Sequence, residues 1–224
     1  MKTDFFNMSK TLSHNLAGLA FLGAACLSVS SQAMERYSEN GHYQRVVPAQ
    51  TQMGIVKSKD KIDVVEFFLY SCLHCYRLEP KLAKWVEKNK DKVSFRRIPA
   101  VITPQWVALA KAYYIAEELG ILDKTHDALF KAIVEDKKIY LSAFTLAEFF
   151  VDYGVDRNKF KELFNSKKIV DKVSDARILS AKYKFRGVPI VVVNDEFKTA
   201  PFYVKDQEQM IDVMDFLVVK SSIK

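Results

Sequence analysis

The chain has 224 residues, of which 49% are apolar and 27% are charged, and its formal net charge is +7. This balance is typical of a soluble globular protein and argues against a disordered chain. Acidic residues lie between the lysines along the whole sequence, so we interpret the lysines as a solvated surface rather than as a nucleic-acid-binding footprint.

The N-terminal segment has the layout of a secretory signal peptide. Two lysines precede an apolar stretch at residues 16–29, and the small residues Ser31 and Ala33 follow at the two positions that a signal peptidase reads. The apolar stretch is too short to span a bilayer comfortably. We therefore expect residues 1–33 to be a cleaved signal peptide, with an uncleaved anchor as the alternative. Met8 is an alternative start residue, because Lys10 still follows it.

Removal of the signal peptide changes the number of cysteines from three to two. Cys26 lies within the signal, so the mature chain holds only Cys72 and Cys75. An exported protein with a single, closely spaced pair has no framework of structural disulfides. The pair therefore either performs redox chemistry or binds metal. A lipoprotein signal at Cys26 is disfavoured, because Gly23 stands where such signals usually have leucine.

The first part of the mature chain predicts a strand, a helix and a second strand. Residues 34–61 are polar and mixed, and they predict a leading loop that can hold one edge strand. Residues 63–70 form a short run rich in valine and phenylalanine, which is typical of a buried strand. A helical pattern covers residues 71–90, where Pro80 should kink the helix. Residues 93–98 predict the next strand, joined to the first by a right-handed crossover.

Residues 104–183 predict helices throughout. Apolar residues recur at helical spacing, and the pattern breaks briefly at Gly120, Ser142 and Gly154. Ser142 and Asp156 have the short polar side chains that accept hydrogen bonds from the first turn of a helix. We therefore expect several helices, two of which begin directly after these residues.

The C-terminal part predicts two strands and a helix. Residues 189–194 form a strongly β-branched run, a short turn leads to a partner strand, and residues 206–220 predict the last helix. Together, the elements predict an α/β, thioredoxin-like fold with an inserted all-helical domain. The thioredoxin-like domain is discontinuous, at residues 34–103 and 184–224, and the helical insertion covers 104–183.

The sequence Cys72-Leu73-His74-Cys75 lies where the first strand ends and the helix begins. This spacing lets the two sulfurs form a disulfide and places Cys72 over the unsatisfied N–H groups of the first helical turn. A thiolate in this position has a depressed pKa and acts as nucleophile or leaving group in disulfide exchange. Cys75 is expected to be buried and to act as the resolving thiol. His74 can donate a hydrogen bond to the thiolate and add positive charge.

A zinc site is the alternative explanation for this spacing. Zinc requires two further ligands, and the mature chain has no second cysteine pair. Its only nitrogen donors of the histidine type are His42, His74 and His126. We therefore favour redox chemistry, with no metal and no cofactor.

Two groups of motifs resemble those of the DsbA family of periplasmic thiol:disulfide interchange proteins, in the thioredoxin superfamily. They are Glu66-Phe67-Phe68 with Cys72-Leu73-His74-Cys75-Tyr76, and Arg186-Gly187-Val188-Pro189 with Val193-Asn194. The resemblance spans nearly all of residues 34–224. It implies a monomeric dithiol oxidase in the periplasm that introduces disulfide bonds into reduced exported proteins. It also implies recharging by a quinone-linked inner-membrane partner of the DsbB type.

The resemblance also implies a substrate-binding role for Val188 and Pro189. It predicts a cis bond before Pro189, close to the cysteine pair, where the backbone of Val188 would pair with an extended substrate chain. The alternative is an ordinary proline that opens a strand. The family usually has proline where this chain has Leu73. This departure leaves the redox potential open.

Glu66 lies between two apolar residues of a strand, so its carboxyl group should be desolvated and its pKa raised. It matches the buried acid of the family near the resolving cysteine, which implies proton handling for Cys75. The alternative is an acid at the end of a strand that reaches solvent.

Two other functions are weighed against the oxidase. A disulfide isomerase or reductase of this superfamily usually carries an N-terminal dimerisation segment, and residues 34–62 are too few for one. A non-catalytic, thioredoxin-like chaperone would keep the fold without the chemistry. The presence of Cys72, His74, Cys75 and Pro189 argues against it.

Overall fold

The computed structural model describes residues 36–46, 58, 60–184 and 187–223. The expected signal peptide at 1–33 lies outside these residues. Residues 37–224 form one structural unit, which is described here by itself. No helix in the described part of the chain is both long and apolar enough to cross a membrane.

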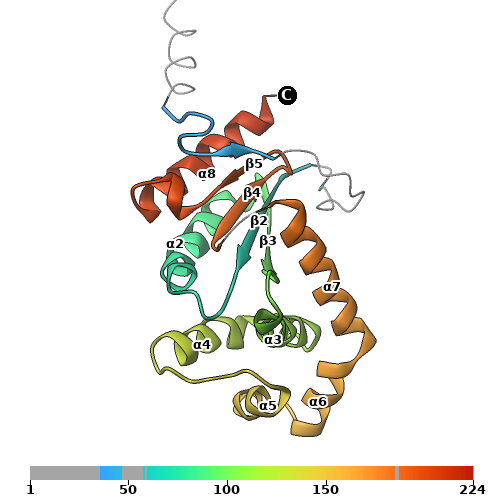
Figure 1. Cartoon of the computed structure of the whole chain (residues 1–224). Coiled ribbons are helices and arrows are strands. Elements are labelled where there is room, and N and C mark those ends of the chain that lie inside the picture. Colours follow the sequence, from blue (N-terminus) through green and yellow to red (C-terminus); the bar gives the residue numbers. More distant parts are fainter. Residues whose placement is uncertain (1–35, 47–57, 59, 185–186, 224) are drawn as a thin grey trace, which may run out of the picture. The chain divides into compact units, whose positions relative to one another are not determined.

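The described residues form a mixed sheet of five strands in the order β1–β5–β4–β2–β3 (Figure 1). The strands are β1 (Gln44–Arg45), β2 (Ile62–Phe68), β3 (Val93–Pro99), β4 (Ile190–Val193) and β5 (Phe197–Thr199). β2 and β3 are parallel, whereas the other three pairs are antiparallel. β1 is the edge strand that the sequence predicts for the leading loop.

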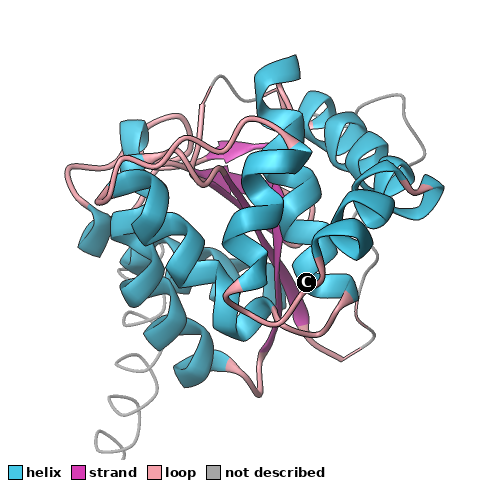
Figure 2. Ribbon diagram, turned by 90° about the horizontal axis from the view of Figure 1, so that it is seen from below, coloured by secondary structure: helices cyan, strands magenta, loops and turns pink. Residues whose placement is uncertain are grey.

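Helices cover both faces of the sheet, and Figure 2 shows the strands between them. α2 (Leu73–Asn89) and α8 (Gln207–Ser222) share one apolar cluster with Val64 of β2. α3 (Val107–Glu118) and α7 (Lys167–Lys182) share another with Val65 and Phe67, which lie one and three positions after Val64 along the strand. Successive side chains of a strand point to opposite faces. This is why β2 is apolar almost throughout, as expected for a central strand covered on both sides.

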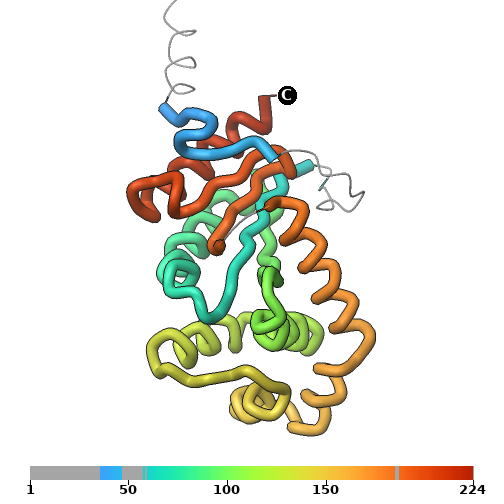
Figure 3. Tube along the Cα trace, viewed as in Figure 1, coloured from blue at the N-terminus to red at the C-terminus, as the bar shows by residue number. Residues whose placement is uncertain are grey.

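A block of helices lies between β3 and β4 in the chain, and Figure 3 shows the chain leaving the sheet after β3 and returning through α7. Besides α3 and α7, it contains η1 (Pro104–Trp106), α4 (Leu122–Val134), α5 (Ala143–Val151) and α6 (Arg157–Asn165). Ser142 accepts a hydrogen bond from the N–H of Thr145, and Asp156 accepts hydrogen bonds from the first turn of α6. Both predicted N-caps are therefore confirmed. The assignment of 104–183 as a separate domain stays a prediction.

Two local features bear on the predicted elements. β4 and β5 are joined through Asn194 and Asp195, whose φ angles are 54° and 58°. Two consecutive left-handed residues form the hairpin turn that matches the twist of antiparallel strands, and asparagine and aspartate tolerate this conformation. α2 begins at Leu73 and continues through Pro80. The kink at Pro80 stays a prediction.

Candidate active site

Cys72 is the N-cap of α2, four residues after the end of β2. Its backbone is extended, with φ −93° and ψ 111°. Its N–H donates to the carbonyl of Leu69 at 2.9 Å, and its own carbonyl accepts from the N–H of Tyr76 at 3.0 Å. These contacts turn the chain from strand to helix. They place the sulfur of Cys72 at the positive end of the helix, where backbone N–H groups have no helical partner.

The surroundings of Cys72 favour its thiolate. The N–H of Cys75 donates to the Cys72 sulfur at 3.2 Å. The hydrogen bond from the Cys75 thiol, followed by the backbone N–H groups of Cys75 and His74, lowers the pKa of Cys72 to about 7, although partial burial opposes the shift. Near neutral pH, Cys72 is therefore divided between the thiol and the thiolate, which is the reactive form.

Cys75 has the opposite environment. Its side chain is fully buried. Burial raises the pKa of Cys75 far above that of an ordinary thiol, and the hydrogen bond to Cys72 and the negative charges of Cys72 and Glu66 act in the same direction. The two cysteines are therefore chemically distinct: one is accessible and ionises readily, and the other stays protonated within the core.

Val188 and Pro189 lie beside the cysteine pair. The thiol of Cys72 donates to the carbonyl oxygen of Val188 at 3.3 Å. The Val188–Pro189 peptide bond is cis, which confirms the conformation predicted from the sequence. Val188 is half-buried and Pro189 is buried. The structure thus brings Cys72 together with Val188, which lies 116 positions later in the sequence, and with the adjacent Pro189. Their role in substrate binding stays a prediction.

His74 is placed differently from the expectation that its ring contacts the thiolate. The side chain is exposed, and its backbone carbonyl accepts a hydrogen bond from Nε2 of Gln207 at 2.9 Å. Its influence on Cys72 in this structure comes through its backbone N–H. Within the described residues, no hydrogen bond joins the ring to the sulfur. The contribution of the ring stays a prediction. Leu73, next to it, is 43% exposed.

Glu66 is fully buried in β2, so the alternative in which it reaches solvent is wrong. Neither of its carboxyl oxygens makes a hydrogen bond with a described residue. Burial, followed by the negative charge of Glu79, raises the pKa of Glu66 well above the usual range, and only Arg97, with Nε 3.4 Å from Oε2, opposes the shift. Glu66 therefore holds its proton more strongly than an ordinary carboxyl group, and it is close enough to both cysteines to influence them electrostatically.

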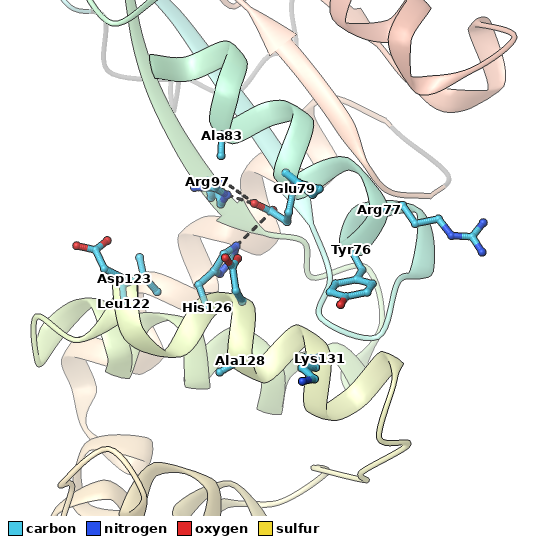
Figure 4. Close-up of a pocket in the computed structure, with 12 residues that line it drawn as sticks. Tyr76, Arg77, Glu79, Ala83, Arg97, Leu122, Asp123, His126, Ala128 and Lys131 are labelled. Atoms are coloured by element: carbon cyan, nitrogen blue, oxygen red, sulfur yellow. Dashed lines mark hydrogen bonds and ion pairs between the residues drawn. The ribbon is translucent and has the colours of Figure 1, made fainter. Parts of the chain in front are cut away.

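Sequence reasoning missed the polar cluster around Glu66. The carboxylate of Glu79 accepts two hydrogen bonds from Arg97, from Nε at 3.2 Å and from Nη2 at 2.6 Å. Nε2 of His126 lies 3.3 Å from Oε1 of the same carboxylate (Figure 4). One signal was available, because Glu79 lies one helical turn beyond Cys75. The pairing of Arg97 with Glu66 depends on the register of β2 and β3, which only the structure shows.

A pocket of about 760 Å³ opens beside this cluster, between α2 and α4. Its lining includes Tyr76, Glu79, Arg97, His126, Asp127 and Lys131. Ligand atoms of Glu79, His126 and Asp127 lie within 4.8 Å of one another, which is a spacing that a metal ion could use. The guanidinium group of Arg97 already bonds both oxygens of Glu79, and its charge would repel a second cation. We therefore assign no metal to this cluster.

Known proteins resemble this chain in sequence and in fold. The sequence model of a family described as DSBA-like thioredoxin domain matches residues 103–214. The chain is 36% identical over 158 residues to the thiol:disulfide interchange protein DsbA of Burkholderia cepacia, a match that covers 70% of this chain and 74% of the relative. It is 31% identical over 201 residues to DsbA of Pseudomonas syringae pv. tomato, covering 90% and 92%.

Solved structures show the same likeness. The crystal structure of DsbA from Pseudomonas aeruginosa superimposes with a TM-score of 0.75 at 30% identity, covering 84% of this chain and 95% of that one. The oxidoreductase DsbA from Xylella fastidiosa superimposes with a TM-score of 0.74 at 28% identity, covering 84% and 99%. These likenesses confirm the predicted α/β, thioredoxin-like fold with inserted helices.

Proposed function

Because the chain belongs to the DsbA family and is a thiol:disulfide oxidoreductase, we propose that Cys72 and Cys75 are its redox-active pair and that it oxidises dithiols in exported proteins. The observation that carries this proposal is the contrast between the two cysteines. Cys72 is accessible and its pKa is lowered to about 7, whereas Cys75 is buried and its pKa is raised. Only Cys72 can therefore exchange with an external thiol.

The proposed reaction consists of two exchanges. A substrate thiolate attacks the sulfur of Cys72 in the oxidised enzyme, the Cys72–Cys75 bond breaks, and Cys75 leaves as a thiolate that takes up a proton. A second substrate thiolate then attacks the substrate sulfur of the mixed disulfide, and Cys72 leaves. The substrate loses two electrons and gains a disulfide, while the enzyme pair is reduced. The low pKa of Cys72 makes it a good leaving group in the second exchange.

Neighbouring residues have supporting roles in this proposal. Glu66, a buried acid whose pKa is raised and which acts electrostatically on Cys75, would supply and accept the proton of that thiol. Val188 and Pro189 would hold an extended substrate chain, a role supported by the 3.3 Å contact of the Val188 carbonyl with Cys72. The exposed ring of His74 would add positive charge when protonated.

The cellular setting is part of the proposal. Residues 1–33 would direct export and be removed, which would place the mature protein in the periplasm. Residues 34–103 and 184–224 would form the catalytic domain, and 104–183 the helical insertion. The protein would act as a monomer on reduced exported proteins, and a quinone-linked, DsbB-type inner-membrane oxidase would restore its disulfide.

The test is the oxidation of a reduced peptide with two cysteines by the oxidised mature protein, without other oxidant. We expect one peptide disulfide for each protein disulfide consumed, and no reaction with Cys72→Ser. A peptide that stays reduced would contradict the proposed function and favour a chaperone. Size-exclusion chromatography gives the complementary result, because a stable dimer would favour an isomerase over the monomeric oxidase.

A further inference from the structure

We propose that His126 is a positioning residue that decides which of two buried carboxyl groups, Glu66 or Glu79, carries a negative charge beside the cysteine pair. The proposal rests on the proposed roles of Cys72 and Cys75. It concerns a residue in α4, within the helical block, that touches neither cysteine. Figure 4 shows dashed contacts from the Glu79 carboxylate to both Arg97 and His126.

The ring of His126 is held in one orientation. The hydroxyl of Tyr70 lies 2.9 Å from Nδ1, and the rings of Phe68 and Phe130 meet it edge to face. Burial raises the pKa of Tyr70 well above that of an ordinary phenol, so the hydroxyl keeps its proton and can donate it to Nδ1. The partner of one ring nitrogen selects the tautomer. Nε2, which lies 3.3 Å from Oε1 of Glu79, therefore carries a proton.

Glu79 is the carboxyl group that stays ionised. Burial opposes its charge, but the polar contact with Nε2 of His126 and the charge of Arg97 outweigh burial and lower the pKa of Glu79. His126 Nε2 and Arg97 Nε are 3.3 Å and 3.2 Å from the same oxygen, Oε1. Among the described residues, no basic side chain contacts Glu66 except Arg97, and this contact is longer, at 3.4 Å. The single negative charge of the pair therefore resides on Glu79.

This distribution of charge affects the cysteines. Glu66 interacts electrostatically with Cys72 and Cys75, so a negative charge on Glu66 would raise the pKa of both thiols. While His126 stabilises ionised Glu79, the repulsion between the two carboxyl groups keeps Glu66 neutral. Without the Nε2 donor, Glu79 holds its charge less well, and Glu66 ionises more often. The thiolate of Cys72 would then be less stable.

Other charged or titratable groups also surround His126. They are Tyr70 before α2, Arg97 of β3, Tyr113 of α3, and Asp123, Asp127 and Lys131 of α4 itself. The three side chains of α4 are exposed, so solvent weakens the effect of their charges, although the carboxylate of Asp127 lies within 4.8 Å of ligand atoms of His126 and Glu79. Tyr113 is a neutral phenol whose pKa burial raises. Glu79 and Arg97 are therefore the charges that govern the effect of His126.

The experiment measures the rate at which iodoacetamide alkylates Cys72 in the reduced protein as a function of pH. His126→Leu should move the midpoint upward by about half a pH unit. In a Glu66→Gln background, the same substitution should leave the midpoint unchanged, because Glu66 can no longer ionise. His126→Gln, whose amide can place a donor near the position of Nε2, should stay close to the parent value. The matched control is His42→Leu, at a half-buried position outside the polar cluster.

Two outcomes would overturn the proposal: an unchanged midpoint in His126→Leu, or an equal shift with and without Glu66. The second would show a merely structural effect of His126. If His126→Leu does not fold, Tyr70→Phe replaces it, because it removes the group that orients the ring. Tyr70→Phe should raise the alkylation midpoint of Cys72 by less than His126→Leu does, and this shift should also disappear in the Glu66→Gln background. An unreactive Cys72 in the parent protein would overturn the proposed function and this inference together.

Discussion

Cys72 shows how backbone position can activate a side chain. Its pKa is lowered by the Cys75 thiol and by the N–H groups of the first turn of α2, not by a neighbouring cationic side chain. These donors belong to the helix itself, so they are present whenever α2 is folded. The replacement of the usual proline of the family by Leu73 leaves this cap geometry in place.

Selective alkylation tests the distinction between the two cysteines. In the reduced protein at pH 7, we expect iodoacetamide to label Cys72 and to spare Cys75, because only Cys72 is accessible and substantially ionised. The alkylation rate should rise with pH to a plateau, and the midpoint of this rise should be at about pH 7. Peptide mapping by mass spectrometry identifies the labelled site. Preferential labelling of Cys75, or a midpoint near the ~8.5 of a free thiol, would contradict the assignment.

Glu66 is expected to lower the stability of the folded protein, although it places a proton donor in the core. Glu66→Leu should raise the free energy of unfolding of the oxidised protein by ~1–3 kcal/mol at pH 7, because it removes a buried carboxyl group without a hydrogen bond. Arg97 keeps Glu79 as its partner. The folded pKa of Glu66 is raised, so the folded protein loses stability as pH rises above the unfolded pKa of ~4.3. The gain should therefore be larger at pH 7 than at pH 4.

Urea titrations at these two pH values measure this effect, and Glu87→Leu is the control. Glu87 is an exposed residue of α2 that pairs with Lys90, and its loss should change stability by less than ~0.5 kcal/mol. The Glu66→Leu protein should also form mixed disulfides more slowly, because the departing thiolate of Cys75 has lost its proton donor. A variant that is less stable than the parent at pH 7 would show that the carboxyl group is satisfied in solution.

At the scale of elements, the sequence predicts those helices, strands and caps that are formed by residues close together in the chain. The β-branched run of β4, the helical spacing of α3 to α7 and the caps at Ser142 and Asp156 are local patterns, and all are confirmed. The start of α2 is two residues later than the pattern predicts, because Cys72 acts as the cap. Helix ends depend on a single hydrogen bond, which periodicity does not reveal.

The polar cluster could not be predicted in the same way. Glu79, Arg97 and His126 come from α2, β3 and α4, and they meet only when these elements pack. Each residue alone is compatible with an exposed helix face or strand edge. The pairing of Glu66 with Arg97 follows from the register of two parallel strands, which the lengths of the strands do not determine. The site residues near the cysteines were found because their motifs are contiguous.

The caps of the helical block provide a test at this scale. Asp156 accepts hydrogen bonds from the N–H groups of Asn158 and Lys159, both at 2.9 Å. Asp156→Ala should therefore lower the free energy of unfolding by ~1 kcal/mol. The alkylation midpoint of Cys72 should not move, since the cap lies outside the polar cluster. Denaturant titration and the alkylation profile measure the two effects. A stability equal to that of the parent would mean that α6 does not need this cap.

At the scale of the whole molecule, the helical block and the sheet meet at the active site. Tyr76 of α2 donates a hydrogen bond to Glu135 at the end of α4, at 2.5 Å. His126 of α4 faces Glu79 of α2 on the other side of the pocket. The helix that carries the cysteines is therefore held at two points by α4. The packing of α4 against α2 can thus influence the redox chemistry of the cysteines, although no residue of α4 named here touches a sulfur atom.

The whole account depends on a thiolate that is stable only in the reduced, folded protein. Reduction of the pair by glutathione releases one proton when Cys72 ionises and none when it stays a thiol. Since Cys72 has a pKa of about 7 and Cys75 does not ionise, proton release begins between pH 6 and pH 8. Higher pH should therefore favour the reduced protein.

The most direct test is the equilibrium constant for reduction of the protein by glutathione, measured at pH 6 and pH 8 by acid quenching and mass spectrometry. We predict that the constant rises roughly tenfold between these values, once the ionised fraction of glutathione is corrected for. A constant that does not change between pH 6 and pH 8 would show that Cys72 is an ordinary thiol and would contradict the account.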